Sequence, residues 1–313
     1  DFGFGVGASR LVGGERTFHR ELEMGLARFM GTEDALALVS GYGTNTSLIG
    51  HILSTGDLLI YDSLSHSSVM AGTGITRAVK IAFEHNNLEA LEKILQKKRP
   101  EFKRAMIVCE GLYSMDGDCV DLPRIVELKQ RYNAWLYVDE AHSIGVMGDT
   151  GRGVAEHFGV DRRHIDITMG TLSKTFGSCG GFIGATSQVI EWLRHTLPGY
   201  VYSVGLPPPV AAAAQAALEV LTTEPERVSQ LQYNARYFLE GARRRRLRTG
   251  LAGGFAIIPL HFSNRENALD AYRLLLANGI YAPPIVQLAV PKDLPRLRMF
   301  ISAAHTEKQI DRT

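Results

Sequence analysis

Short apolar runs alternate with helical patterns over residues 35–185 of the chain. The clearest runs predict strands at Leu58–Tyr61, Met106–Cys109, Trp135–Val138 and Asp166–Met169. Between the second and third runs the pattern predicts a helix that begins near Asp121, because Pro123 would then lie in its first turn. Strands that are apolar throughout and separated by helices indicate an α/β fold, in which a mostly parallel central sheet has helices on both faces.

The segments on either side of this region have patterns of their own. Residues 15–30 predict a helix, because their apolar positions fall on one face. After residue 205 the sequence predicts helices at Val210–Leu221, Glu224–Arg246 and Glu266–Asn278, strands at Phe255–His261, Ile280–Ala282 and Leu297–Ser302, and a helix that starts at Thr306. We therefore expect a large domain over residues 1–205 and a smaller C-terminal α+β domain over residues 206–313.

The composition excludes several classes of protein. The chain has 313 residues and a formal net charge of +1, so it has no basic footprint for nucleic acid or an anionic membrane surface. No apolar run reaches the roughly 18–20 residues that a membrane-spanning helix needs. Cys109, Cys119 and Cys179 lack the spacing of a metal site or a disulfide framework, which favours a reducing, cytoplasmic location and no bound metal. The chain opens at Asp1 rather than at a methionine, and we expect it to be part of a longer protein.

Polar residues that follow the predicted strands are the candidates for a site, because ligands of parallel sheets bind beyond the carboxyl ends of the strands. Three such segments stand out: Glu110–Asp118, Asp139–His142 and Thr171–Gly181. Lys174 is flanked by small and hydroxyl residues, which suits an amine that forms an imine with a flat ligand. An acid such as Asp139 suits a cationic ring nitrogen, and hydroxyls with glycine amides suit a phosphate.

Together these motifs resemble those of the α-oxoamine synthases, enzymes that use pyridoxal 5'-phosphate (PLP) and have the aspartate-aminotransferase fold, called fold type I. The matching segments are SRLVGG (9–14), HRELE (19–23), LVSGYGTN (38–45), YDSLSHSS (61–68), CEGLYSMDGD (109–118), LYVDEAHSIGVMG (136–148), TLSKTFGSCGG (171–181), YSVGLPP (202–208) and RLRMFISAAHT (296–306). They follow the family's order over almost the whole chain, which makes the combination far more specific than any single motif.

The resemblance implies roles for the residues around the cofactor ring. Lys174 matches the lysine that binds PLP covalently, and Asp139 matches the acid that keeps the pyridine nitrogen protonated. His66 matches the histidine that stacks on the ring, and His142 matches a residue near the phenolic oxygen. These four residues are the predicted catalytic group.

The resemblance also implies residues for the phosphate, the substrate and a partner subunit. The remaining cofactor-binding residues are Gly41, Tyr42, Thr171 and Ser173 at the phosphate and Glu110 and Ser114 beside the ring. Asn45 matches a polar residue near the substrate. Ser203 matches a hydroxyl that reaches the phosphate of the neighbouring subunit, which implies a homodimer with shared active sites.

One position departs from the family's pattern. Many members hold the carboxylate of the amino acid with an arginine that precedes a Pro-Pro pair, and this sequence aligns Val286 there. A bidentate arginine clamp is therefore missing at that position. Arg298 aligns with a nearby family arginine and is the substitute that we expect.

The predicted enzyme is a PLP-dependent acyltransferase that condenses a small amino acid with an acyl thioester and releases CO2. Alternatives are transamination or retro-aldol cleavage with the same cofactor, or a non-catalytic partner subunit of a synthase. The GER and HRELE segments resemble members appended to polyketide synthases, so we expect the thioester on an acyl carrier protein rather than on coenzyme A. Because carrier proteins are acidic, Arg10, Arg16 and Arg20 are candidate docking residues.

Overall fold

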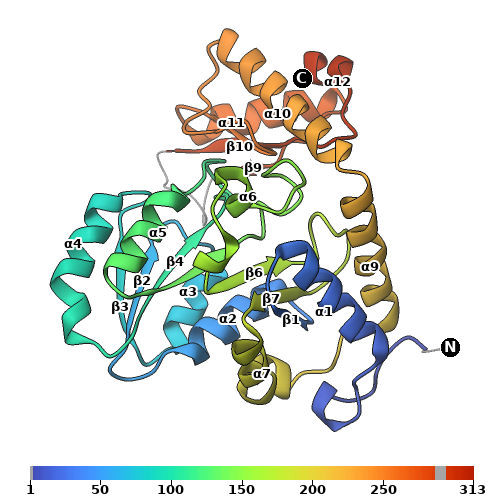
Figure 1. The fold of residues 1–313 in the computed structure, drawn as a ribbon. Helices are drawn as coiled ribbons and strands as arrows, with labels where there is room; N and C mark the ends of the chain where they lie inside the picture. The colour runs from blue at the N-terminus through green and yellow to red at the C-terminus, as the bar shows by residue number, and fades with distance from the viewer. Residues whose placement is uncertain (1–2, 286–293) are drawn as a thin grey trace.

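A computed structural model describes residues 3–285 and 294–313, which form a seven-stranded sheet and a three-stranded sheet (Figure 1). The large sheet has the order β1-β7-β6-β5-β4-β2-β3. Its strands are β1 (Asp34–Leu38), β2 (Leu58–Asp62), β3 (Val79–Phe83), β4 (Ala105–Glu110), β5 (Trp135–Asp139), β6 (Ile167–Thr171) and β7 (Gly181–Ala185). Neighbouring strands are parallel except at β7, which is antiparallel to both β1 and β6. The predicted α/β fold with a mostly parallel sheet is confirmed.

Helices cover both faces of the large sheet, and α10, α11 and α12 lie on the side of the small sheet that faces away from the large one (Figure 1). They are α1 (Thr17–Met30), α2 (Gly41–Ile52), α3 (Ser67–Ile75), α4 (Leu88–Lys98), α5 (Leu122–Arg131), α6 (Val154–Phe158), α7 (Ser187–Thr196), α8 (Pro198–Val201), α9 (Pro208–Thr223), α10 (Glu226–Arg244), α11 (Arg265–Ala277) and α12 (Glu307–Arg312). The predicted start of α5 is confirmed, because the Asp121 side chain accepts the Arg124 N–H at 3.2 Å and a proline lies in the first turn. None of the described helices is long and apolar enough to cross a membrane.

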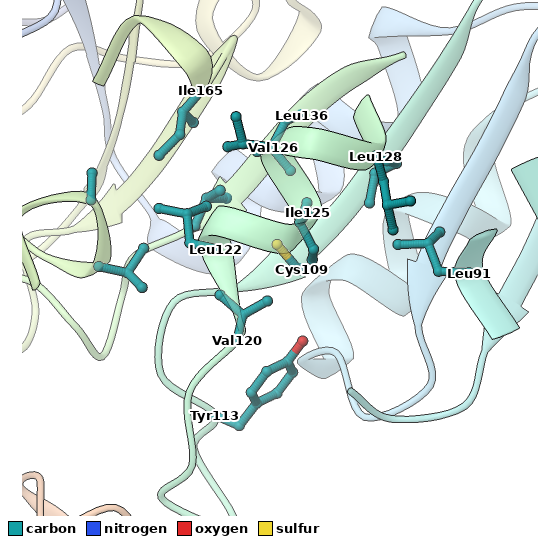
Figure 2. Close-up of a cluster of buried hydrophobic side chains, with 14 of the residues drawn as sticks. Leu91, Cys109, Tyr113, Val120, Leu122, Ile125, Val126, Leu128, Leu136 and Ile165 are labelled. Carbon is teal, nitrogen blue, oxygen red and sulfur yellow. The ribbon is translucent and has the colours of Figure 1, made fainter. Parts of the chain in front are cut away.

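Alternate residues of β4 pack on opposite faces of the sheet. Ile107 and Cys109 belong to the apolar cluster with α4 and α5, of which Figure 2 labels Cys109 beside α5. Met106 and Val108 belong to the cluster that contains residues of α2 and α7. Successive side chains of a strand point to opposite faces, so a strand that is covered on both sides reads as one continuous apolar run.

The small sheet has the order β8-β10-β9 and is antiparallel, with β8 at Ile257–His261, β9 at Pro284–Ile285 and β10 at Arg296–Phe300. The predicted strand at Ile280–Ala282 is wrong, because pairing with β10 begins only at Pro284. The N–H of Ile280 instead bonds to the Leu275 carbonyl at 2.9 Å, and Gly279 has a φ of +75°. Residue 280 therefore still belongs to the turn that ends α11.

Helix α9 lies in the connection between the two sheets and packs along α1 (Figure 1). Ala211, Ala214 and Leu218 of α9 share one apolar cluster with Leu22 and Leu26 of α1. The helix therefore contributes to the core beneath the large sheet, although it lies after residue 205. The division at that residue stays a prediction.

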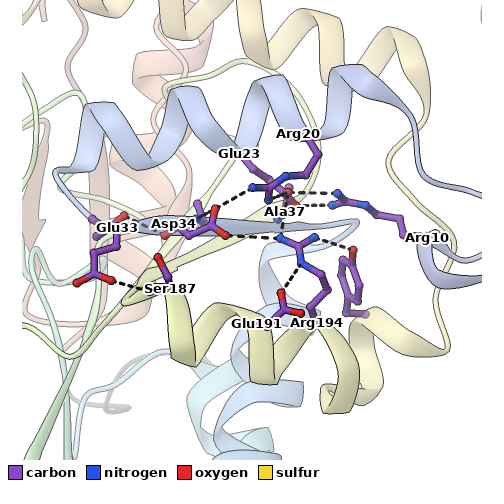
Figure 3. A network of polar contacts seen from close by, with 12 residues as sticks. Arg10, Arg20, Glu23, Glu33, Asp34, Ala37, Ser187, Glu191 and Arg194 are labelled. Carbon is purple, nitrogen blue, oxygen red and sulfur yellow. Dashed lines mark hydrogen bonds and ion pairs between the residues drawn. The ribbon is translucent and has the colours of Figure 1, made fainter.

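A buried network of charges joins the N-terminal segment to α1, and Figure 3 shows its centre at Glu23. Arg10 is 4% exposed and forms ion pairs with Glu15 and Glu23, whose side chain is fully buried. Glu23 also accepts the Ala37 N–H of β1 at 2.9 Å and an ion pair from Arg20 at 2.6 Å. The expectation that Arg10 docks a carrier protein is therefore wrong, because a buried guanidinium committed to two carboxylates presents no charge to a partner.

Candidate active site

The predicted site residues meet at the carboxyl ends of the parallel strands. A cavity of about 330 Å³ is lined by Gly41, Tyr42, Asn45, His66, Glu110, Asp139, His142, Thr171, Ser173 and Lys174. A second cavity of about 480 Å³ adjoins it, contains Ser114 and Arg298 in its wall, and shares His66, His142 and Lys174 with the first. Ser203 lines neither cavity. Val286 lies outside the described residues, so the proposed loss of the arginine clamp there has no structural account.

Asp139 ends β5 and is held by bonds to both carboxylate oxygens. The Ala141 N–H donates to Oδ1 at 2.9 Å, and the side-chain amide of Asn45 donates to Oδ2 at 2.7 Å. The phenol of Tyr137 in turn donates to the amide oxygen of Asn45. Asp139 is 4% exposed, and these bonds aim its carboxylate into the cavity in a fixed orientation.

His66 lies at the N-terminus of α3, where its ring is the helix cap. The Ser68 N–H donates to Nδ1 at 3.3 Å, and the Ser68 hydroxyl lies 2.7 Å from the same nitrogen. Burial lowers the pKa of His66, so the ring is neutral near pH 7. Since Nδ1 accepts from the backbone, the proton of a neutral ring is on Nε2.

Glu110 ends β4 beside Asp139 and accepts the backbone N–H of His66. It is 3% exposed, and burial together with the nearby Asp139 raises its pKa well above the usual value. His142 follows β5, and burial followed by the charge of Lys174 holds its pKa well below 6.5. Burial therefore disfavours the charged form of both Glu110 and His142.

Lys174 lies in the loop that joins β6 to β7. The two ends of that loop are held together, because the Leu172 N–H bonds to the Gly180 carbonyl at 2.9 Å and the Ser178 N–H bonds to the Leu172 carbonyl at 2.8 Å. Although Lys174 is exposed as a whole residue, partial burial of its amine lowers its pKa. Such an amine is more readily deprotonated and more nucleophilic than an ordinary lysine.

The N-terminus of α2 supplies a site for an anion. The Ser40 side chain caps the helix by accepting the Gly43 N–H at 3.0 Å, and the Ser40 carbonyl accepts the Thr44 N–H at 2.9 Å. The first N–H groups, at Gly41 and Tyr42, therefore remain for a ligand. The hydroxyls of Thr171 and Ser173 lie 2.9 Å apart on the same side of the cavity. A Cβ at Gly41 would lie 2.6 Å from the Thr171 hydroxyl, so the close approach of these elements requires glycine.

Arg298 joins the small sheet to the loop after β4. Its Nη1 donates to the Ser114 carbonyl at 2.9 Å, and its guanidinium lies 4.6 Å from the centre of the Phe300 ring. Its Nε is buried without a partner in the described structure. The neighbouring Arg296 is 2% exposed and forms an ion pair with Asp116 at 2.6 Å. Both arginines of β10 therefore hold the loop that carries Ser114.

This donor set fits PLP. The cavity combines an amine for the aldehyde, a carboxylate for the ring nitrogen and helical N–H groups for the phosphate. The described residues contain no cluster of His, Cys, Asp or Glu that could hold a metal ion. Such a cavity at the carboxyl ends of a mostly parallel sheet defines a PLP-dependent enzyme of fold type I.

Similarity to known proteins narrows this class. The model of the aminotransferase class I and II family matches residues 5–313. The 8-amino-7-oxononanoate synthase of Treponema denticola is 38% identical over 311 residues, which cover 99% of this chain and 78% of that protein. The serine palmitoyltransferase of Bacteroides thetaiotaomicron is 37% identical over 310 residues, again 99% of this chain and 78% of that protein. The solved structure of serine palmitoyltransferase from Sphingomonas wittichii has a TM-score of 0.95 at 32% identity and covers 100% of this chain and 78% of its own.

The chain belongs to the aminotransferase class I and II family and, within it, to the α-oxoamine synthases. It is a PLP-dependent C-acyltransferase.

Two residues that the sequence analysis did not select complete the site. Ser68 bonds to both His66 and Asn45, and Tyr137 bonds to Asn45. Tyr137 lies two residues before Asp139, so the period of a strand places both on one face and could have indicated it. Ser68 follows His66 in SHSS, where its hydroxyl gave no signal beyond a helix start.

Proposed function

We propose that the two adjoining cavities condense a small amino acid with an acyl thioester, release CO2 and give an α-amino ketone. The observation that carries the proposal is the meeting of Lys174, Asp139 and His66 in one cavity. When bound, PLP supplies an electron sink that makes the α-carbon of an amino acid acidic. The chain's own residues must then hold the cofactor, move the α-proton and orient the thioester.

Lys174 holds the cofactor covalently at rest, and its amine is also the base that moves the α-proton. The lowered pKa of Lys174 favours the neutral amine that both tasks need. Asp139 holds the ring nitrogen in its protonated form, since an anion beside a cation stabilises the charge of each. Asn45, which we predicted near the substrate, orients Asp139 through its 2.7 Å hydrogen bond.

His66 stacks on the ring and donates a hydrogen bond to the thioester carbonyl. This role is supported by the ring's tautomer, because Nδ1 accepts from Ser68 and leaves the Nε2–H free to donate. A donor aimed at a carbonyl stabilises the negative charge that develops on its oxygen during attack. His142 and Glu110 complete the walls around the ring.

Arg298 holds the carboxylate of the amino acid. Two observations support this role of Arg298. It lines the second cavity together with Lys174 and His66, and its buried Nε has no protein partner in the described structure. Burial lowers the pKa of Arg298, yet a guanidinium stays charged at any pH at which the enzyme works. Loss of CO2 from a carboxylate held there would follow bond formation at the α-carbon.

The active enzyme is a homodimer in which Ser203 reaches the phosphate of the neighbouring subunit. Support comes from exposed apolar side chains around Ser203: Tyr202 is 87% exposed, Val204 50% and Val12 78%. The segments that carry them are adjacent, because Ser9 pairs with Val204 in an isolated bridge. Contiguous exposed apolar side chains are typical of protein interfaces.

A panel of amino acids with acyl coenzyme A and acyl carrier protein, read by mass spectrometry, tests this function. Condensation requires a thioester and releases CO2, whereas transamination yields a keto acid and retro-aldol cleavage yields an aldehyde without a thioester. We expect a higher rate with the carrier-bound thioester. Full activity with acyl coenzyme A at low concentration would overturn the carrier preference, and product without a thioester would overturn the reaction.

A further inference from the structure

A buried ion cluster lies behind the active-site loops and contacts neither cavity. His85 lies just after β3 and bonds to two carboxyl groups. Its Nδ1 is 2.9 Å from Oδ1 of Asp62, and its Nε2 is 2.9 Å from Oδ2 of Asp118. The three side chains are 13%, 0% and 10% exposed. The backbone N–H of Asn86 donates a hydrogen bond to Asp62 at 2.9 Å, and its side-chain amide donates one to Asp118 at 2.7 Å.

The two carboxylates lie at the bases of two active-site loops. Asp62 ends β2, and it accepts the Leu64 N–H at 2.8 Å, which shapes the turn that leads to His66. The Asp118 carbonyl accepts the Tyr113 N–H at 2.9 Å and so closes the loop that carries Ser114. One imidazole therefore connects the loop that presents His66 to the loop that presents Ser114.

We infer that His85 is a positioning residue for the condensation, which fixes the His66 and Ser114 loops relative to each other by an ionic bridge between Asp62 and Asp118. The inference rests on the proposed function for its effect on catalysis, but the bridge itself is a property of the folded chain. It requires a cation, because Asn86, the other residue that bonds to both carboxylates, is neutral, and two buried carboxylates with no positive charge between them repel each other.

The surroundings of His85 favour the cation. Both ring nitrogens face carboxylates, and the Tyr113 ring lies edge-on with its centre 4.5 Å from that of the imidazole. Burial opposes the charge, but the hydrogen bonds to Asp118 and Asp62 outweigh it and raise the pKa of His85 to about 10. Since Asp118 Oδ1 is buried without a partner in the described residues, the cluster has no spare donor to replace the imidazole.

Four variants test the bridge. His85→Gln keeps a polar side chain but removes the cation, and we expect kcat to fall by about tenfold or more while KM for the amino acid changes less than about threefold. Adding Asp118→Asn removes the uncompensated carboxylate and should restore much of the loss, which a role in packing alone would not do. Asp118→Asn alone completes the cycle. His195→Gln is the matched control, because His195 pairs with Glu191 at 3.1 Å on the surface.

Measurements on the cofactor-free protein separate the bridge from the reaction. The imidazole of His85 should titrate near pH 10 by NMR, and His85→Gln should shift the His66 resonances, which His195→Gln should leave unchanged. An imidazole that titrates near pH 6.5, or unchanged His66 resonances, would overturn the inference whether or not condensation is found. If His66 shifts but the parent enzyme forms no product, the proposed function fails and the bridge stands. Unchanged kcat in His85→Gln of an active enzyme would also overturn the positioning role.

Discussion

The side-chain amide of Asn45 donates a hydrogen bond of 2.7 Å to Asp139, although the two residues are 94 positions apart in the sequence. Asn45 lies in α2, and Asp139 ends β5, the central strand of the large sheet. Asp139 is thus oriented by a residue that contributes no charge, and the hydrogen bond fixes the direction of its carboxylate.

Asn45→Ala should weaken both catalysis and folding. It leaves Asp139 Oδ2 and the Tyr137 phenol without their partner, and leaving buried polar groups unpaired costs about 1–3 kcal/mol. We expect activity to fall by about tenfold, with PLP still bound, as followed by kcat and by urea unfolding. Tyr137→Phe is the control, because it spares the bond to Asp139. An equal loss of activity in both variants would argue against the orienting role.

Asp139→Asn should keep PLP bound but remove most activity, because a neutral amide cannot stabilise a protonated ring nitrogen. The Ala141 N–H at 2.9 Å would still find an acceptor, so the loop should keep its shape. The assay is turnover alongside the visible absorbance of the bound cofactor. Turnover within about tenfold of the parent, or about 1.4 kcal/mol, would show that the assigned role is wrong.

Lys174→Ala should abolish the visible absorbance of covalently bound PLP, since no other lysine of the described residues lines the cavity. Borohydride reduction of the loaded enzyme followed by peptide mapping should label Lys174. Lys80, on β3, and Lys103, before β4, serve as internal controls. A cofactor label on either of them would refute the assignment.

Glu110→Gln should stabilise the cofactor-free protein more at pH 8 than at pH 5. An unfolded glutamate loses its proton near pH 4.3, but burial raises the pKa of Glu110 in the folded state. Between these two values the unfolded chain has released a proton that the folded chain keeps, so the parent loses stability as the pH rises. The variant has no such proton, so its stability relative to the parent should rise with pH. Each 1 kcal/mol gained in the free energy of unfolding should raise its melting temperature by about 2–4 °C relative to the parent. A difference that is constant from pH 5 to 8 would contradict the raised pKa.

Arg10→Leu should destabilise the fold by about 3–5 kcal/mol, because it leaves Glu23 buried with fewer partners. Urea unfolding measures the effect. Arg16→Ala is the control, since the Arg16 side chain bonds to two backbone carbonyls near the surface, and it should change stability by no more than about 0.5 kcal/mol. Equal stability of the two variants would mean that the network at Glu23 contributes little.

The strand ends were predictable because apolar runs locate the strands and the motifs that follow them are local in sequence. Asp139, Lys174 and Glu110 could be selected in this way, and the structure brings them into one cavity. The role of Asn45 could not be predicted, since its partner depends on how α2 packs against β5. The burial of Arg10 could not be predicted either, because Arg10 contacts Glu23 only when the N-terminal segment packs against α1.

The strand error in the small sheet has a different cause. Ile280 and Tyr281 favour a strand, but the turn that ends α11 still holds the N–H of Ile280. Local preference for a strand therefore yields to a helix end that is fixed by Gly279.

The antiparallel β7 limits how the lysine loop can change. Thr171 and Gly181 are partners in the β6–β7 ladder, and Gly181 is also the partner of Leu38 at the end of β1. The segment 172–180 is thus the loop of a hairpin, and both of its ends are fixed by strand pairing beside the end of β1 and the start of α2. An inserted or deleted residue there would rotate Lys174 away from Asp139 or move Gly180 against Leu38. Gly180 has no room for such a change, because even an added Cβ would lie 2.6 Å from the Leu38 carbonyl oxygen. Loop grafts from relatives should consequently succeed only when donor and recipient segments have equal length.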